Sequence, residues 1–125
     1  MPAYNFQQRF AGLVKRRIKR QTIRARRKDG RDPKVGQRFV GYSGLRTKKC
    51  RRLVTGTITE VLPIEITPEH FRLAGKVLDI AEANSIALLD GFSHANEMVG
   101  WFLATHGRRF AGHLIRWLPD RNSAR

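Results

Sequence analysis

Apolar residues recur at every fourth position near the start of this chain, which indicates an amphipathic helix. The residues at this spacing are Phe6, Phe10, Val14 and Ile18. Because an α-helix turns once in about 3.6 residues, we expect these four side chains to share one face. The β-rich segment 21–24 follows, so the chain is expected to enter a strand there. Lys19, Thr22 and Arg24 would then lie at the junction, a suitable place to hold a phosphate or to do chemistry beside one.

The excess positive charge lies entirely in the first half of the chain. The 125 residues include 25 lysines and arginines and 10 aspartates and glutamates, a net charge of +15. Residues 1–62 hold 18 basic and 3 acidic side chains, whereas residues 63–125 hold 7 of each. This asymmetry indicates a polyanionic partner, and nucleic acid is the first candidate because each neutralised phosphate releases condensed counterions. We expect RNA in preference to DNA, and no membrane partner, since no apolar run approaches about eighteen residues.

The length of the chain fits one domain with its own core, which we expect over residues 1–118, followed by a flexible tail over residues 119–125. Cys50 is the only cysteine, so an internal disulfide is impossible and a reducing compartment is expected. The first residues lack the apolar stretch of a signal peptide, which favours a cytoplasmic protein. The sequence identifies no protein partner.

Patterns along the rest of the chain predict a small α+β domain with several short strands and two or three helices. The expected strands are Gln37–Tyr42, a long or divided segment Leu53–Ile66 that Pro63 interrupts, and Phe110–Trp117. Asp79 and Glu82 form a capping-box pattern that opens a helix, and Gly107 is expected to end a second helix. The pattern alone does not distinguish a closed barrel from an open sheet.

Lys19 and Thr22 are the first candidates for catalytic groups. A lysine near a threonine hydroxyl can remove its proton when burial or neighbouring cations favour the neutral amine. A carboxylate must complete the set, and we choose Asp90 because it lies at a turn between two helical patterns, with Glu97 and Asp79 as alternatives. In a purely structural alternative, Thr22 pairs in a strand, Lys19 is solvated and Asp90 caps the turn.

Two basic loops supply the candidate nucleic-acid-binding residues. Guanidinium groups grip phosphates bidentately, and lysines act as point charges. Tyr42 offers a stacking face for an unpaired base, whereas Phe39 is more typical of a core position. Arg9 lies on the helix and is expected to face the same side as Arg24. The candidates are Arg9, Arg24, Arg26, Tyr42, Arg46, Lys48, Lys49, Arg51 and Arg52.

The sequence contains no pattern for a metal or a cofactor. Its four histidines lack metal-ligand spacing, and a single cysteine argues against a zinc site. It contains neither a Walker loop nor a Gly-x-Gly-x-x-Gly fingerprint. We therefore expect no bound metal and no cofactor, and we expect Trp101 and Trp117 in the core.

Several segments resemble ASCH domains, which belong to the PUA-like superfamily. The opening signature runs Phe6-Gln7-Gln8-Arg9-Phe10 and then Lys19-Arg20-Gln21-Thr22-Ile23-Arg24. Later marks are similar to phage- and prophage-type members, so the resemblance covers nearly the whole chain. These marks are Gly44-Leu45-Arg46-Thr47-Lys48-Lys49-Cys50-Arg51, Asp90-Gly91-Phe92, Trp101-Phe102 and Ile115-Arg116-Trp117.

The resemblance implies a small β-barrel flanked by helices, with a cleft for RNA or nucleotides. One branch of the family deacylates N-acetylated cytidine, and other members are linked to ribonuclease activity. Lys19 and Thr22 match the lysine and threonine of that branch, whose third catalytic group is a glutamate that falls near Asp90, one methylene shorter. We therefore expect nucleic-acid binding first and hydrolysis as the alternative. A third hypothesis is a phage protein that blocks or recruits a host nucleic-acid machine.

Overall fold

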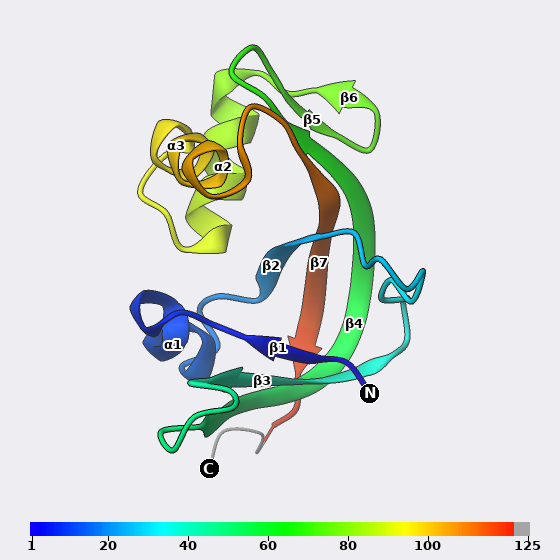
Figure 1. Cartoon of the computed structure of the whole chain (residues 1–125), viewed down its shortest axis with the longest axis vertical. Helices are drawn as coiled ribbons and strands as arrows, with labels where there is room; N and C mark the ends of the chain where they lie inside the picture. Colours follow the sequence, from blue (N-terminus) through cyan, green and yellow to red (C-terminus); the bar gives the residue numbers. More distant parts are fainter. Residues whose placement is uncertain (122–125) are drawn as a thin grey trace.

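A curled, mixed β-sheet forms a half-barrel with helices on its concave side (Figure 1). The computed structural model describes residues 1–121, which contain three helices and seven strands. The helices are α1 (Gln8–Lys15), α2 (Ile80–Asp90) and α3 (Ala95–His106). The strands are β1 (Ala3–Asn5), β2 (Gln21–Ala25), β3 (Arg38–Ser43), β4 (Arg51–Ile66), β5 (Phe71–Leu73), β6 (Lys76–Val77) and β7 (Phe110–Pro119).

The sheet is open between β1 and β2, and we call this opening the seam. β4 pairs with β3 along its first half, with β5 at its end and with β7 along most of its other edge. β1 runs parallel to β3, and β2 runs antiparallel to β7, so β1 and β2 end the path from β1 through β3, β4 and β7 to β2. Across the seam, the Arg24 guanidinium donates to the Asn5 carbonyl oxygen at 2.8 Å.

β4 is one continuous strand of 16 residues, so the long-strand alternative is confirmed. Pro63 does not interrupt it. The Pro63 carbonyl accepts from the Ala74 N–H at 2.8 Å, so this residue's backbone polar groups face the β5 edge and the ladder with β7 needs no N–H there. The irregularity in the β4–β7 register lies between Ile58 and Glu60 instead.

Two apolar clusters fill the concave side of the sheet, one at each end of β4 and β7. One lies under α2 and α3 and includes Phe71, Ile86, Met98, Phe102 and Phe110. The other joins β1, α1 and β3 to the sheet and includes Phe6, Val14, Phe39, Leu53 and Trp117. β2 passes between the helices of the two ends (Figure 1). A crossing strand between two cores is what positions the site described below.

The first helix ends earlier than the apolar spacing predicts. α1 stops at Lys15, and Arg17 turns the chain with a left-handed φ of 63°. Ile18 therefore leaves the buried face and is 60% exposed, so the expectation that it packs with Phe6, Phe10 and Val14 is wrong. Lys19 turns inward instead and is 3% exposed, which contradicts the structural alternative in which it is solvated.

Other local predictions are confirmed. Asp79 and Glu82 form the reciprocal capping box of α2, and Gly107 caps the end of α3. Trp117 is buried, whereas Trp101 is only half-buried. Within residues 1–121, no helix has both the length and the apolar character needed to span a bilayer.

The predicted tail over residues 119–125 lies partly outside the described residues, from residue 122 onward. Pro119 ends β7, and the Asp120 carboxylate accepts hydrogen bonds from Arg38 and Thr55. Asp120 therefore ties the end of β7 to β3 and β4.

Candidate functional site

Lys19, Thr22 and Asp90 line one pocket, as the choice of Asp90 requires. The pocket has a volume of about 270 Å³ and lies where β2 passes between the two apolar clusters. We call it the aromatic pocket because five aromatic side chains contribute to its walls. They are Phe6, Phe10, Phe92, Trp101 and Phe102. The polar walls come from Asn5, Gln7, Lys19, Thr22, Arg24 and Asp90.

Lys19 and Asp90 form a buried ion pair at the base of this site. The Lys19 Nζ lies 3.1 Å from the Asp90 Oδ1 and donates to the Asp90 carbonyl oxygen at 2.6 Å. Their side chains are 3% and 6% exposed. The pair joins the start of β2 to the end of α2, so it fixes one wall of the pocket against the other.

A chain of polar contacts holds the Asp90 carboxylate in place. The Gln21 amide donates to the Asp90 Oδ1 at 3.2 Å and to the Ile86 carbonyl at 3.0 Å. The Gln21 Oε1 accepts from the Arg116 Nε at 3.3 Å, and Arg116 pairs with Glu60 at 3.0 Å. Gln21 is fully buried by this arrangement, so its amide serves only the protein's own groups.

The environment of Lys19 favours its neutral form. Burial lowers the pKa of Lys19, the Arg24 cation lowers it further, and the attraction of Asp90 opposes these effects without cancelling them. Both acceptors of the amine belong to Asp90. A neutral amine therefore donates twice to Asp90 and keeps its lone pair for a third direction, which is the arrangement a general base needs.

Arg24 organises the opposite side of the pocket. Its Nε donates to the Thr22 Oγ1 at 2.9 Å, and its guanidinium carbon lies 5.1 Å from the ring centres of both Tyr4 and Phe6. Burial lowers the pKa of Arg24, but a guanidinium remains charged at neutral pH. Thr22 accepts through its oxygen, which leaves the hydroxyl proton for another partner.

The two alternative carboxylates serve helix starts rather than the pocket. Glu97 accepts from Ser93 and pairs with Arg9 at 3.5 Å, and Asp79 caps α2. Arg9 in turn lies over the rings of Phe10 and Phe92, at 4.7 and 5.0 Å. Arg9 therefore places a cation at the aromatic wall, on the same side as Arg24 through their shared neighbour Phe6-to-Phe10 segment.

The basic loop between β3 and β4, residues 44–50, is held in a defined turn. Thr47 donates to the Gly44 carbonyl through its N–H and its hydroxyl, at 3.0 and 2.6 Å. Asn5 connects this loop to the aromatic pocket, because its side-chain oxygen accepts from the Leu45 N–H while its carbonyl accepts from Arg24. The cations of this loop are therefore presented from an ordered support.

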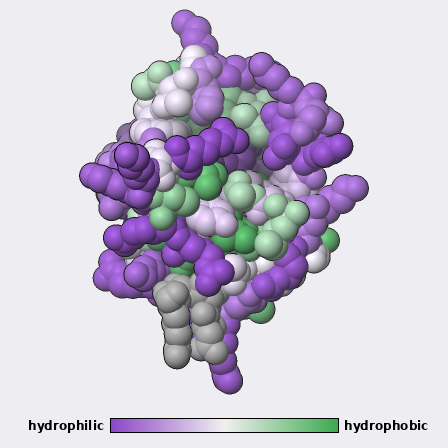
Figure 2. All heavy atoms as spheres, turned by 60° about the horizontal axis from the view of Figure 1, so that its bottom comes forward, coloured by the Kyte–Doolittle hydropathy of each residue, from purple (hydrophilic) through white to green (hydrophobic). Residues whose placement is uncertain are grey.

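The remaining candidate cations lie on the surface around this loop. Lys48, Lys49 and Arg51 line a groove beside Gln8 at the start of α1, and Arg26, Arg46 and Arg52 are exposed. Tyr42 is half-buried in β3. Figure 2 brings the lower end of Figure 1 forward, and hydrophilic residues surround a smaller apolar area there. The structure thus gathers Arg9 and Arg24 at the pocket and the loop cations beside it, whereas Arg26 follows β2 on the far side of the seam.

Sequence reasoning missed Gln21, Phe92 and Trp101 as site residues. Gln21 lies inside the segment that was singled out, but its role depends on α2, whose distance from it no local pattern reveals. Phe92 follows Asp90 by two residues, and this proximity was a usable signal. Trp101 was expected in the core, yet it lines the pocket from α3.

Comparison with models of protein families, with curated proteins and with solved structures finds no match for this chain. The resemblance to ASCH domains therefore remains an expectation from the motifs. The function of the site has to be inferred from its geometry, namely a small aromatic pocket with a buried lysine–carboxylate pair and a cationic rim.

Proposed function

We propose that this chain is an ASCH-type, PUA-like domain that binds RNA in preference to DNA. One unpaired base enters the aromatic pocket, and the adjoining backbone phosphates follow the basic loop. The half-barrel with helices on its concave side is compatible with the PUA-like architecture. Single-stranded RNA suits such a site because its unstacked bases can be splayed into aromatic pockets. A single cysteine and an RNA partner are consistent with a cytoplasmic protein.

The observation that carries this proposal is the contact of Asn5 with both the aromatic pocket and the basic loop. It makes one continuous surface from a pocket that accepts a flat ring and a loop that offers cations. Arg24 and Arg9 stand over aromatic rings of the pocket wall, so a base stacked there also meets fixed positive charge. A general polyanion sink needs the cations but not the pocket.

Charge reversal in the basic loop is expected to weaken RNA binding strongly. The affinity of the unmodified protein for a short labelled single-stranded RNA should fall with salt, with a slope of about −0.7 per phosphate contacted. Replacing Arg46, Lys48 and Arg51 with glutamate should lower affinity by at least about tenfold and reduce that slope by about one per residue. Fluorescence anisotropy across a salt series measures both quantities.

A matched control is available in the electrically balanced half of the chain. Replacing Arg72, Arg108 and Arg121 with glutamate changes the net charge by the same amount at exposed positions away from the loop. This control should retain most of the affinity. Equal losses in both variants, or equally tight binding of heparin, would show that net charge alone attracts the polyanion.

Hydrolysis of a modified nucleoside or of RNA is the second candidate, favoured by the buried Lys19–Asp90 pair beside Thr22. In this mechanism the neutral Lys19 amine takes the Thr22 hydroxyl proton as the oxygen attacks the acyl carbon or phosphorus. Arg24 orients the Thr22 oxygen, and Asp90 holds the amine. The shorter aspartate is sufficient here because it reaches Lys19 directly.

Replacing Thr22 with valine is the cleanest test of that mechanism. Valine keeps the shape and removes the hydroxyl, so turnover of N-acetylated cytidine or RNA should be lost while the fold loses only about 1 kcal/mol. Thr22→Ser restores a hydroxyl and should recover activity. Mass analysis of incubated substrates measures turnover. The enzymatic hypothesis is abandoned if acylated cytidines and RNA stay intact with the unmodified protein, or if Thr22→Val is as active.

A further inference from the structure

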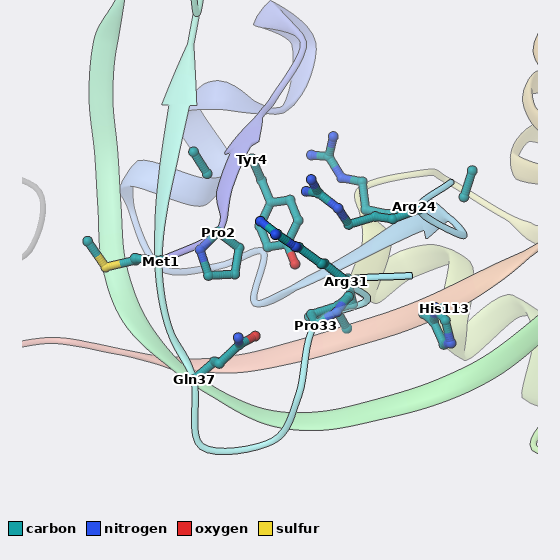
Figure 3. Close-up of a pocket in the computed structure, with 12 residues that line it drawn as sticks. Met1, Pro2, Tyr4, Arg24, Arg31, Pro33, Gln37 and His113 are labelled. Atoms are coloured by element: carbon teal, nitrogen blue, oxygen red, sulfur yellow. The ribbon is translucent and has the colours of Figure 1, made fainter. Parts of the chain in front are cut away.

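A second pocket, which we call the seam pocket, opens between β1 and β2. It has a volume of about 460 Å³, larger than the aromatic pocket, and falls in the usual range for small-molecule sites. Its walls come from β1, β2, β7 and the loop over residues 26–37, with Tyr4 at the centre (Figure 3). The nucleic-acid surface described above does not use this pocket, apart from the shared side chain of Arg24.

Two buried polar atoms without hydrogen-bond partners belong to residues that line the seam pocket. They are the Tyr4 hydroxyl and the His113 Nδ1. Tyr4 is 9% exposed, and its hydroxyl points into the pocket (Figure 3). The nearest carboxylate to the His113 Nδ1 is that of Asp32, at 3.8 Å, which is too long for a hydrogen bond. Buried polar groups normally have partners, so a ligand that supplies them is favoured here.

Cations and apolar side chains lie at different parts of this pocket. Arg24 and His113 stand toward one end, Met1 and Pro2 toward the other, and Arg31 reaches across the Tyr4 ring (Figure 3). Arg27 already pairs with Asp29 at 2.8 Å. Among the residues that the structure describes, no acidic side chain pairs with Arg31 or Arg24. Two guanidiniums without carboxylate partners therefore face the same cavity.

Tyr4 is suited to donate rather than to accept. Burial raises the pKa of Tyr4, and the neighbouring Arg24 cation only partly opposes this effect. The hydroxyl thus keeps its proton at neutral pH, and a phosphate oxygen is a strong acceptor for it. The apolar end then accommodates an uncharged, planar body attached to that phosphate.

We propose that the seam pocket binds a nucleoside monophosphate, with the phosphomonoester held by Tyr4, Arg24 and Arg31 and the nucleoside against Met1, Pro2 and Pro33. A phosphomonoester carries close to two negative charges, which suits two guanidiniums, whereas each internal phosphate of an RNA strand carries one. This inference does not depend on RNA binding at the aromatic pocket, because Tyr4 and Arg31 line only the seam pocket.

Titration with uridine 5′-monophosphate, uridine and inorganic phosphate tests the proposal. The side-chain nitrogen resonances of His113 should shift with the monophosphate, which should bind more tightly than either fragment. Tyr4→Phe removes one hydroxyl and should weaken binding about tenfold, the equivalent of a hydrogen bond to a charged group. Arg31→Gln, at an exposed position, should weaken it by a similar factor without any effect on folding.

Lys48→Gln is the matched control, since it removes an exposed cation that lines only the groove beside α1. It should leave monophosphate binding unchanged, and Tyr4→Phe should leave RNA affinity unchanged. Inorganic phosphate that binds as tightly as the monophosphate would overturn the assignment of a nucleotide. Absence of a His113 shift, or equal weakening by Lys48→Gln and Arg31→Gln, would overturn the site itself. Loss of RNA binding alone would count only against the function proposed above.

Discussion

Replacing Lys19 with methionine is expected to destabilise the protein by about 3–5 kcal/mol, because it leaves the Asp90 carboxylate buried without its cation. The two side chains are 3% and 6% exposed, so water does not replace the lost partner. Methionine fills most of the volume of lysine, which separates the electrostatic effect from that of a cavity. Urea-induced unfolding, followed by tryptophan fluorescence, measures the change in the free energy of unfolding.

Two further variants make this prediction specific. Lys76 pairs with Glu82 at 3.0 Å on the surface, where the lysine side chain is 69% exposed, so Lys76→Met should cost less than about 1 kcal/mol. Adding Asp90→Asn to Lys19→Met removes the unpaired charge and should recover part of the loss. Equal costs for Lys19→Met and Lys76→Met would mean that the buried pair does not stabilise the fold.

The same buried pair limits how Lys19 can be used to test catalysis. The sequence suggested that Lys19→Ala would abolish turnover without loss of stability, because a lysine between a helix and a strand is usually solvated. In the structure that variant also breaks the contact between β2 and α2. Thr22 is the better probe, since its hydroxyl can be removed while the ion pair stays intact.

Elements whose determinants lie within a few residues could be predicted from the sequence. The capping box of Asp79 and Glu82 and the glycine cap at Gly107 are local backbone devices, and both have the expected form. β2 begins at Gln21, as its β-rich composition indicates. Such signals need no knowledge of what packs against them.

Features that depend on distant residues could not be predicted in the same way. Lys19 and Asp90 are 71 residues apart, so their burial follows from the packing of α2 against β2 and not from either local pattern. Ile18 followed the apolar spacing, but the chain leaves the helix at Arg16 and Arg17. The seam pocket exists only because β1 and β2 do not pair, which the topology decides.

Replacing Gly112 with alanine is expected to destabilise the protein by about 3 kcal/mol or more, because β2 and β7 approach too closely there for a side chain. A Cβ at this position would lie inside van der Waals contact with the Arg24 carbonyl oxygen, 2.9 Å from the Arg24 carbonyl carbon and 3.0 Å from the Ala25 Cα. All of these atoms belong to the backbone, so no rotamer change relieves the overlap. The strands themselves must separate.

Gly100 provides the opposite control within the same chain. It lies in α3, and a Cβ added there meets no atom within 4 Å, so Gly100→Ala should stabilise the protein by about 0.5–1 kcal/mol. Urea unfolding of the two alanine variants compares them directly. Because Gly112 pairs with Ala25 on the strand that carries Thr22 and Arg24, Gly112→Ala should also weaken RNA binding under conditions where the protein remains folded. Unchanged stability in Gly112→Ala would contradict the close approach of β2 to β7, and with it the placement of both pockets along β2.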